Sequence, residues 1–312
     1  MHDLAIIIVS TNEATWLRPC LTSVFEHAGP IALDVVVADN ESTDGTRQLV
    51  EEEFPRARVV TCRNRGFSHA NNRGIMATDS RYVLLLNPDT EVLEGTFAHL
   101  VDDLDDRSTV GAVGVKQVTP DGALFPTVRR FPNALRAWGE ALACERWPVG
   151  AGLFGERELD LARYDRELDC DWTSGSFLLL RREALESAGL LDERFFIYSE
   201  ETDLCLRVKR SGWEVRHLPC MTILHHAGKA GVSAKMEAQA AYARLQFVRK
   251  NFSPAHRGAY VAALYAQHLL RAGFPRGPER RAASRRALRV LLGKEDAPFG
   301  PPPPHGVVAR GT

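Results

Sequence analysis

Four short apolar runs in the first 90 residues constrain the fold most, because each is continuous rather than alternating. They predict strands over residues 5–9, 35–38, 58–61 and 82–86. Continuous apolar runs are typical of strands that are buried on both faces of a sheet. Helical patterns separate them at 14–26, 46–53 and 69–77. This alternation predicts an α/β fold: a Rossmann-like, mostly parallel mixed sheet flanked by helices.

The rest of the chain predicts one further strand of the sheet and then several helices. Residues 117–169 are rich in Pro and Gly and predict a loop-rich connection, after which 176–180 predict a strand and 181–188 a helix. Helices at 233–250 and 254–271 predict a C-terminal helical appendage. Beyond Gly273 the chain is rich in Arg and Pro, which predicts disorder. We therefore expect a main domain over 1–231, an appendage over 232–273 and a tail over 274–312.

Composition narrows the classes of function. A net charge of −1 removes the general electrostatic argument for nucleic-acid binding. The six cysteines form no C-x-x-C pair, so structural zinc is not expected. No stretch has the length of a membrane span, and the N-terminal apolar run is too short for a signal peptide. We expect a cytoplasmic location, with peripheral contact at the inner membrane surface as a further hypothesis.

Polar side chains follow each of the four predicted strands. The carboxyl ends of parallel strands meet at one edge of a sheet, which is where ligands bind in folds of this kind. Each cluster alone is also typical of ordinary turns, but four in succession favour a binding site. The clusters are Ser10-Thr11-Asn12-Glu13, Asp39-Asn40 with Ser42-Thr43-Asp44-Gly45, Arg63-Asn64-Arg65-Gly66, and Asn87-Pro88-Asp89.

In their order and spacing these residues resemble the family 2 glycosyltransferases, especially the rhamnosyltransferase-like branch. The resemblance covers roughly residues 4–231 and continues through three later segments. These are Ser174-Gly175-Ser176-Phe177, the run from Asp192 to Leu204, and His225-His226-Ala227-Gly228. It implies the GT-A fold, in which a nucleotide sugar and a divalent cation share the end of one sheet.

The resemblance also implies which residues bind the donor. Asp39 would contact a uracil or thymine base, and Thr11 would lie beside the nucleoside. The expected donor is a dTDP- or UDP-hexose, with dTDP-rhamnose as the first choice, and the expected acceptor is a hydroxyl of a glycan or lipid-linked sugar. The full set expected to bind the nucleotide sugar is Ser10, Thr11, Asn12, Glu13, Asp39, Asn40, Ser42, Asn64, Gly66, Asn71, Asn72, Asn87 and Gly175.

Asp89 and His225 are the metal ligands that the resemblance implies. A carboxylate that holds Mg²⁺ or Mn²⁺ suits a diphosphate leaving group, because the cation neutralises the charge that develops on it. Asn87 stands where many relatives carry a further carboxylate. His226 is the alternative to His225, and an ordinary hydrogen-bonded role is the alternative for either histidine.

A second acidic cluster, Glu200-Glu201-Thr202-Asp203, predicts the general base. By resemblance Glu201 takes the acceptor proton, and attack from the face opposite the nucleotide inverts the sugar carbon. Glu200 and Asp203 are the alternatives for this role. Helix capping also favours carboxylates at a helix start, but the preceding aromatic residues indicate a partly desolvated setting suited to a base.

Four other functions are alternatives to sugar transfer. A nucleotidyltransferase, a dehydrogenase or an ATPase would need a glycine-rich phosphate loop, and Ser10-Thr11-Asn12-Glu13-Ala14 contains no glycine. A non-catalytic sugar-nucleotide-binding protein is disfavoured by Asp39, Asp89 and Glu201. The C-terminal basic segment, from Arg271 to Lys294, predicts either a solvated helix or tail, or a helix that contacts anionic lipid.

Overall fold

The computed structural model describes residues 2–144, 151–226, 233–273 and 277–299. The chain divides into two compact units. The first combines Met1–Phe131, Glu156–Leu191 and Glu201–Lys229. The second combines Pro132–Gly155, Asp192–Glu200 and Ala230–Thr312. The expected main domain therefore corresponds to the first unit, with two internal segments that belong to the second.

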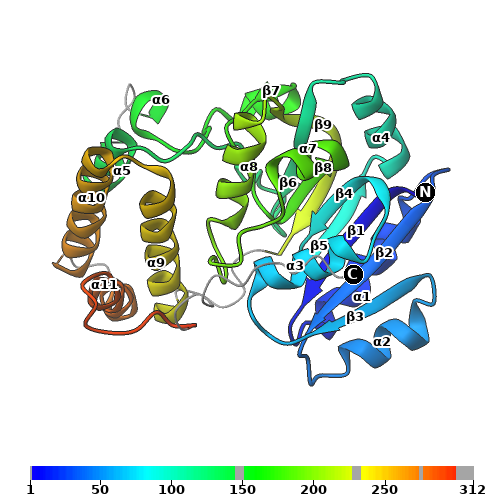
Figure 1. The fold of residues 1–312 in the computed structure, drawn as a ribbon, viewed down its shortest axis with the longest axis horizontal. Coiled ribbons are helices and arrows are strands. Elements are labelled where there is room, and N and C mark those ends of the chain that lie inside the picture. The colour runs from blue at the N-terminus through cyan, green and yellow to red at the C-terminus, as the bar shows by residue number, and fades with distance from the viewer. Residues whose placement is uncertain (1, 145–150, 227–232, 274–276, 300–312) are drawn as a thin grey trace. The chain divides into compact units, whose positions relative to one another are not determined.

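The predicted parallel layer is confirmed in the first unit (Figure 1). Four parallel strands lie in the order β3, β2, β1, β4. Their bounds are β1 His2–Ser10, β2 Leu33–Asn40, β3 Ala57–Cys62 and β4 Ser80–Leu86. Ile6 and Ile8 enter the core on one face of β1, while Ile7 enters the core on the other. This two-sided burial is why the apolar runs are continuous.

The sheet continues beyond β4 with strands of both directions. Its order among the described residues is β3-β2-β1-β4-β8-β6-β9-β5, with β7 paired to β9. Strand β8 is antiparallel to both β4 and β6, whereas β9 is parallel to β6. The sheet is therefore mixed, as predicted. These strands are β5 Thr90–Glu94, β6 Val110–Val118, β7 Leu168–Asp169, β8 Phe177–Arg181 and β9 Glu214–His225.

Helices cover both faces of this sheet. One face packs against α1 Ala14–Glu26, α2 Thr46–Glu53 and α4 Phe97–Asp105. The other packs against α3 Phe67–Met76, α7 Arg182–Ala188 and α8 Glu200–Arg210, with the short helix η2 Leu161–Asp165 beside β9. The predicted bounds of α1 and α2 are confirmed at both ends.

The second unit is helical. Helix α9 packs against α11, and α10 packs against both α5 and α11. The predicted helices at 233–250 and 254–271 are confirmed by α9 and α10. Within the described ranges, no helix is long and apolar enough to cross a membrane. The bounds are α5 Ala134–Ala141, α6 Ala151–Phe154, α9 Ala234–Asn251, α10 Pro254–Gly273 and α11 Pro278–Leu291.

The prediction of a disordered tail over 274–312 was wrong for α11. This helix buries Ala283, Ala287, Val290 and Leu291 on one side, which is the spacing of a single apolar stripe. The carbonyl of Leu291 also accepts a hydrogen bond from Tyr265 Oη. The arginines on its other sides lower its mean hydropathy, so the apolar stripe is hard to recognise in the sequence. Residues 274–276 and 300–312 lie outside the described residues.

The loop-rich prediction for 117–169 was wrong at α5. Asn133 caps this helix, because its Oδ1 accepts a hydrogen bond 2.9 Å long from the backbone N–H of Arg136. Gly139 inside the helix lets Phe154 of α6 pack closely: a Cβ at Gly139 would lie 2.4 Å from that of Phe154. Proline and glycine therefore mark a helix start and a packing contact here, rather than an irregular loop.

Candidate active site

The candidate site residues of the first unit gather at one edge of its sheet. Strands β1, β2 and β4 are parallel, so their carboxyl ends lie together. Because β8 is antiparallel to β4, with Phe177 opposite Leu86, the segment that precedes β8 reaches the same edge. Parallel β6 and β9 end there too, with Val118 opposite Leu224. The sheet therefore places the segments around Asp39, Asp89, Gly175 and His225 along one edge.

The loops after β1, β2 and β3 are joined by side-chain hydrogen bonds. The amide of Asn40 donates to Thr11 Oγ1 over 3.2 Å and to Asn64 Oδ1 over 3.0 Å. Asn12 adopts a left-handed backbone with φ of 57°, a conformation that asparagine tolerates. Its Oδ1 accepts from the backbone N–H of Thr43 over 2.7 Å. Three of the four predicted clusters thus form one connected, pre-shaped surface.

Asp39 is 6% exposed at the end of β2 and shapes the next turn. Its Oδ1 accepts a hydrogen bond from the backbone N–H of Ser42 over 3.1 Å. Ser42 Oγ in turn accepts from the backbone N–H of Asn12 and donates to the carbonyl of Ser10. The hydroxyl of Ser10 is fully buried and has no hydrogen-bond partner among the described residues. These contacts bring together four of the residues predicted to bind the nucleotide.

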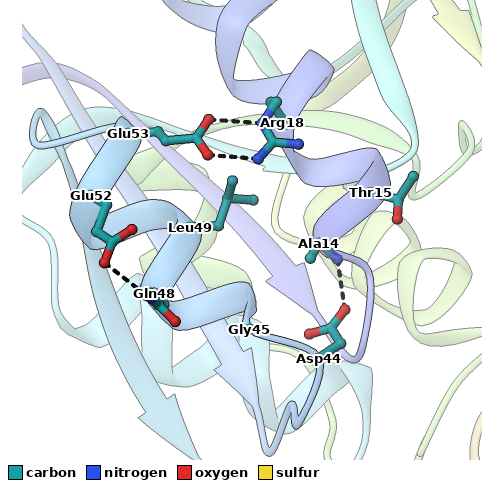
Figure 2. Close-up of a pocket in the computed structure, with 9 residues that line it drawn as sticks. All are labelled: Ala14, Thr15, Arg18, Asp44, Gly45, Gln48, Leu49, Glu52 and Glu53. Carbon is teal, nitrogen blue, oxygen red and sulfur yellow. Dashed lines mark hydrogen bonds and ion pairs between the residues drawn. The ribbon is translucent and has the colours of Figure 1, made fainter.

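Asp44 connects the first turns of α1 and α2. Figure 2 shows its bond to Ala14 at the start of α1. Its Oδ2 accepts from the backbone N–H of Ala14 over 2.9 Å, and its Oδ1 accepts from the hydroxyl of Thr46 over 2.6 Å. Burial acts to raise the pKa of Asp44, but the hydrogen bonds from Thr46 and Ala14 hold that pKa below its ordinary value. Asp44 therefore stabilises the loops as a carboxylate.

A cavity of about 310 Å³ opens between α1 and α2 beside Asp44 (Figure 2). The ion pair of Arg18 and Glu53 ties the two helices together there, with Nη2 and Oε1 2.6 Å apart. None of the residues predicted to bind the nucleotide lines this cavity. We therefore do not assign the nucleotide to it.

The remaining residues predicted to bind the nucleotide differ in environment. Gly66, with φ of 104°, precedes α3, and Glu13 occupies the start of α1 without a side-chain cap. Asn71 is 1% exposed, and its Oδ1 has no partner among the described residues. Asn72 has both polar groups engaged: Nδ2 donates to the carbonyl of Leu191 and Oδ1 accepts from its backbone N–H. Asn72 thus has a structural role in holding the segment after α7.

The predicted metal ligands Asp89 and His225 lie together. His225 Nε2 is 3.6 Å from Asp89 Oδ1, and both side chains are largely buried. His226 has other contacts, because its Nε2 is 2.7 Å from Glu91 Oε1 and its ring lies 4.7 Å from that of Trp16. The geometry therefore favours His225 over His226 as the partner of Asp89.

A hydrogen bond fixes the turn that carries Asp89. Thr90 Oγ1 donates to the carbonyl of Asn87 over 2.7 Å, and Thr90 is 1% exposed. Asn87 also donates its backbone N–H to the carbonyl of Ser176 over 3.0 Å, which ties this turn to the start of β8. The residues described in the structure include no cluster of three or more His, Cys, Asp or Glu side chains suited to a metal. A cation at Asp89 and His225 would need further oxygen ligands from a diphosphate or water.

Glu201, near the start of α8, lies against Gly175. A Cβ added at Gly175 would be 3.5 Å from Glu201 Cβ and 3.8 Å from its Cδ. Glu201 Oε2 is buried and has no hydrogen-bond partner among the described residues, although the residue as a whole is partly exposed. Burial raises the pKa of Glu201, while its own backbone N–H and the charge of Arg129 act in the opposite direction. A desolvated carboxylate of this kind is suited to accept a proton.

The two alternatives to Glu201 have different environments. Asp203 is fully buried and accepts a 2.9 Å hydrogen bond from Arg207 Nε. Arg207 in turn donates to the carbonyls of Ala188 and Gly189, so this pair anchors α8 to the end of α7. Glu200 is the first residue of α8 and is 5% exposed. The contacts of Asp203 therefore favour a structural role for it.

Two residues near Glu201 and Gly175 were not predicted from the sequence. Arg129 lies close enough to Glu201 to influence its pKa, and its guanidinium lies 5.2 Å from the centre of the Trp172 ring. Gln117 is fully buried near the end of β6, where its Oε1 accepts from Ser176 Oγ over 2.9 Å. The sequence feature that could have identified Gln117 as a site residue is its place as a polar residue at the end of an apolar strand.

Comparison with known proteins identifies the family of this chain. Residues 5–187 match the family described as Glycosyl transferase family 2. The chain is 32% identical over 235 residues to an N-acetylglucosaminyl-diphospho-decaprenol L-rhamnosyltransferase from Mycobacterium tuberculosis, which covers 72% of this chain and 76% of that protein. It is 23% identical to the rhamnosyltransferase WbbL of Escherichia coli, over 71% of this chain and 83% of the relative.

Solved structures match the fold at lower identity. A mannosyltransferase from Pyrobaculum calidifontis, in complex with GDP-Man and Mn²⁺, aligns with a TM-score of 0.53 and 18% identity over 96% of this chain and 77% of its own. GalNAc-T7 with UDP, GalNAc and Mn²⁺ aligns with a TM-score of 0.59 and 13% identity, over 94% and 56%. The predicted family and fold are confirmed: this chain belongs to glycosyl transferase family 2 and is a glycosyltransferase with the GT-A fold.

Proposed function

We propose that this protein transfers a hexosyl residue from a nucleotide-diphosphate sugar to a hydroxyl of a lipid-linked glycan, with inversion at the sugar carbon. The observation that carries the proposal is that two acidic side chains at one edge of the sheet have different environments. Asp89 is paired with an imidazole, while Glu201 is desolvated against a glycine. The first group suits a cation and its diphosphate, and the second suits proton abstraction.

The relatives support the choice of donor and acceptor. Two of them are named as rhamnosyltransferases, and one name specifies a diphospho-decaprenol acceptor. We therefore propose dTDP-rhamnose as the donor and a polyprenyl-diphosphate-linked sugar as the acceptor, as in the synthesis of a cell-surface polysaccharide. Sugar specificity within a shared fold depends on variable loops, so the donor is assigned by relationship and not by geometry.

Asp89 and His225 fit a divalent cation in their chemistry. A carboxylate oxygen and an imidazole nitrogen suit Mn²⁺, and two protein ligands leave room for diphosphate oxygens. When bound, Mg²⁺ or Mn²⁺ would supply positive charge to the leaving diphosphate. The remaining steps belong to the protein. The connected loops around Asp39 and Asn40 bind and orient the nucleoside, and Glu201 accepts the proton of the acceptor hydroxyl.

A thermal-shift experiment tests the donor and metal site. UDP or dTDP should raise the melting temperature only with Mn²⁺ or Mg²⁺ present, because a ligand that binds only the native state stabilises it. Asp89→Asn should remove most of that shift, since an amide is a weaker cation ligand than a carboxylate. Glu91→Gln is the matched control, because Glu91 contacts His226 beside the pair. Equal stabilisation in excess EDTA would exclude this site.

We also propose that helix α11 contacts the surface of an anionic membrane, where a lipid-linked acceptor would lie. Arg280, Arg281 and Arg285 lie on α11, and Arg280 and Arg285 are exposed. Basic residues near an anionic bilayer each contribute about 1 kcal/mol of attraction. Replacing these three by Gln should reduce flotation with phosphatidylglycerol vesicles. The same number of changes at Arg47, Arg56 and Arg210 is the charge control, and equal losses in both variants would refute a specific α11 contact.

A further inference from the structure

Gln117 begins a chain of hydrogen bonds that leads into the segment around Gly175. The Gln117 side chain is fully buried at the end of β6, and its Oε1 accepts from Ser176 Oγ over 2.9 Å. Ser176 Oγ lies 2.9 Å from Ser174 Oγ. Three polar side chains from β6 and the segment before β8 are thus connected. Gln117 and Ser176 are buried, so almost no water competes for the hydrogen bond between them, and Ser174 is half-buried.

The segment Ser174–Ser176 contacts both parts of the candidate site. On one side, the carbonyl of Ser176 accepts the backbone N–H of Asn87, two residues before Asp89. On the other side, Gly175 faces Glu201, because a Cβ added at Gly175 would lie in van der Waals range of the Glu201 side chain. A displacement of this segment would therefore move groups next to the proposed cation ligand and the proposed base together.

Gln117 also reaches His225 through its backbone. Its carbonyl accepts a 2.8 Å hydrogen bond from the backbone N–H of Phe125. The ring of Phe125 packs edge-on against that of His225, with centres 5.4 Å apart. One residue of β6 is therefore linked to the surroundings of Asp89, His225 and Glu201.

Gln117 carries a cost for stability that an apolar residue would not. Its Nε2 is buried without a partner among the described residues, and an unpaired buried donor disfavours folding. A residue that conflicts with local stability is expected where function requires it. We infer that Gln117 is a positioning residue that fixes the Ser174–Ser176 segment between the cation ligands and the general base. The inference rests on the proposed transfer reaction.

The test combines Gln117→Met, Ser176→Ala and the double variant. Methionine keeps the length of the side chain and removes both polar groups. With dTDP-rhamnose and a polyprenyl-diphosphate-linked N-acetylglucosamine, each single variant should lower kcat by roughly 10- to 100-fold while the donor KM changes less than about threefold. The double variant should be no slower than the slower single variant, because both changes break one interaction. Unchanged kcat, or losses that multiply, would overturn the inference.

A second measurement does not depend on turnover. Hydrogen exchange of peptides spanning 172–178 should accelerate in Gln117→Met and remain unchanged in Ser80→Ala, which removes a buried hydroxyl at the start of β4. Unchanged exchange in the Gln117 variant would overturn the inference even if the wild type is active. If the wild type transfers no sugar, the proposed function fails, while faster exchange would still support the positioning contact. If Gln117→Met does not fold, Ser176→Ala carries the same test.

Discussion

Asp44 and Glu201 are two carboxylates of the same unit in opposite environments. Asp44 is exposed, yet its oxygens accept hydrogen bonds from Ala14 and Thr46. Glu201 has an oxygen that is buried and unpartnered within the described part of the chain. Hydrogen bonds hold the pKa of Asp44 low against the effect of burial, whereas burial raises the pKa of Glu201. Opposite shifts in one region indicate different roles for the two groups.

The same contrast extends to their neighbours. Around Asp44, the polar groups of Asn12, Asn40 and Ser42 are paired with one another, so the loops keep their shape without a ligand. Around Glu201, buried polar atoms of Gln117 and Thr173 have no partners among the residues that the structure describes. We infer that a change at Asp44 reduces stability first, and a change at Glu201 reduces activity first.

The largest expected effect is on activity at Glu201. Glu201→Gln keeps the shape of the side chain and removes the basic oxygen, so transfer should fall roughly 10²- to 10⁴-fold with donor affinity nearly unchanged. Steady-state transfer kinetics and dTDP binding with Mn²⁺ would measure both quantities. At neutral pH the variant should be at least as stable as the wild type, because it removes a desolvated charge.

Variants of the neighbouring acids sharpen this assignment. Near-normal turnover in Glu201→Gln with collapse in Glu200→Gln would move the proton-accepting role to Glu200. Asp203→Asn should instead lower the melting temperature, because Arg207 would lose a buried ionic partner. Normal activity in all three variants would refute a carboxylate base at the start of α8.

A smaller effect is expected on stability at Asp44. Asp44→Ala removes the acceptor for three donors at the starts of α1 and α2, so the free energy of unfolding should fall by about 1–2 kcal/mol. Urea denaturation would measure this loss. Asp102→Ala on the exposed side of α4 is the charge-matched control and should change stability by less than about 0.5 kcal/mol. A similar loss in both variants would contradict a specific role for Asp44.

Local patterns were sufficient to predict the parallel half of the sheet. The apolar runs of β1 to β4 are buried on both faces, and the polar residues that follow them end each strand. Helix α5 was missed, and α11 was placed in a disordered tail with a basic helix only as an alternative, because their apolar contacts lie in the second unit and alternate with arginine, glycine or proline. Packing against α9 and α10 stabilises them, and no local pattern reports that packing.

In the candidate site too, local sequence patterns did not predict the contacts between distant residues. The residues expected at strand ends could be named because their positions follow from strand order. The bond from Ser176 to Gln117 joins residues 59 positions apart, and the pairing of Asn72 with Leu191 spans 119 positions. Such contacts depend on the insertion of β8 between β4 and β6, which the sequence alone does not specify. The structural role of Asn72 followed only from the three-dimensional pairing.

The smallest expected effect is the pH dependence of stability, and it tests the opposition between the two acids directly. Burial raises the pKa of Glu201 in the folded protein above its ordinary 4.5, so the native state binds more protons there than the unfolded chain. Stability due to Glu201 is therefore greatest below pH 4.5 and is lost as pH rises through the raised pKa. Asp44 has a lowered folded pKa, so its contribution is present above its ordinary 3.8 and is lost as pH falls.

Urea unfolding of the wild type, Glu201→Gln and Asp44→Ala between pH 4 and 8 would separate these contributions. Relative to the wild type, Glu201→Gln should gain stability as pH rises, because glutamine does not ionise and avoids the desolvated charge. The deficit of Asp44→Ala should begin to shrink toward pH 4, because the Asp44 carboxyl of the unfolded chain starts to bind protons near its ordinary pKa of 3.8. If each variant differs from the wild type by a constant free energy of unfolding across this range, neither carboxylate titrates as its environment predicts.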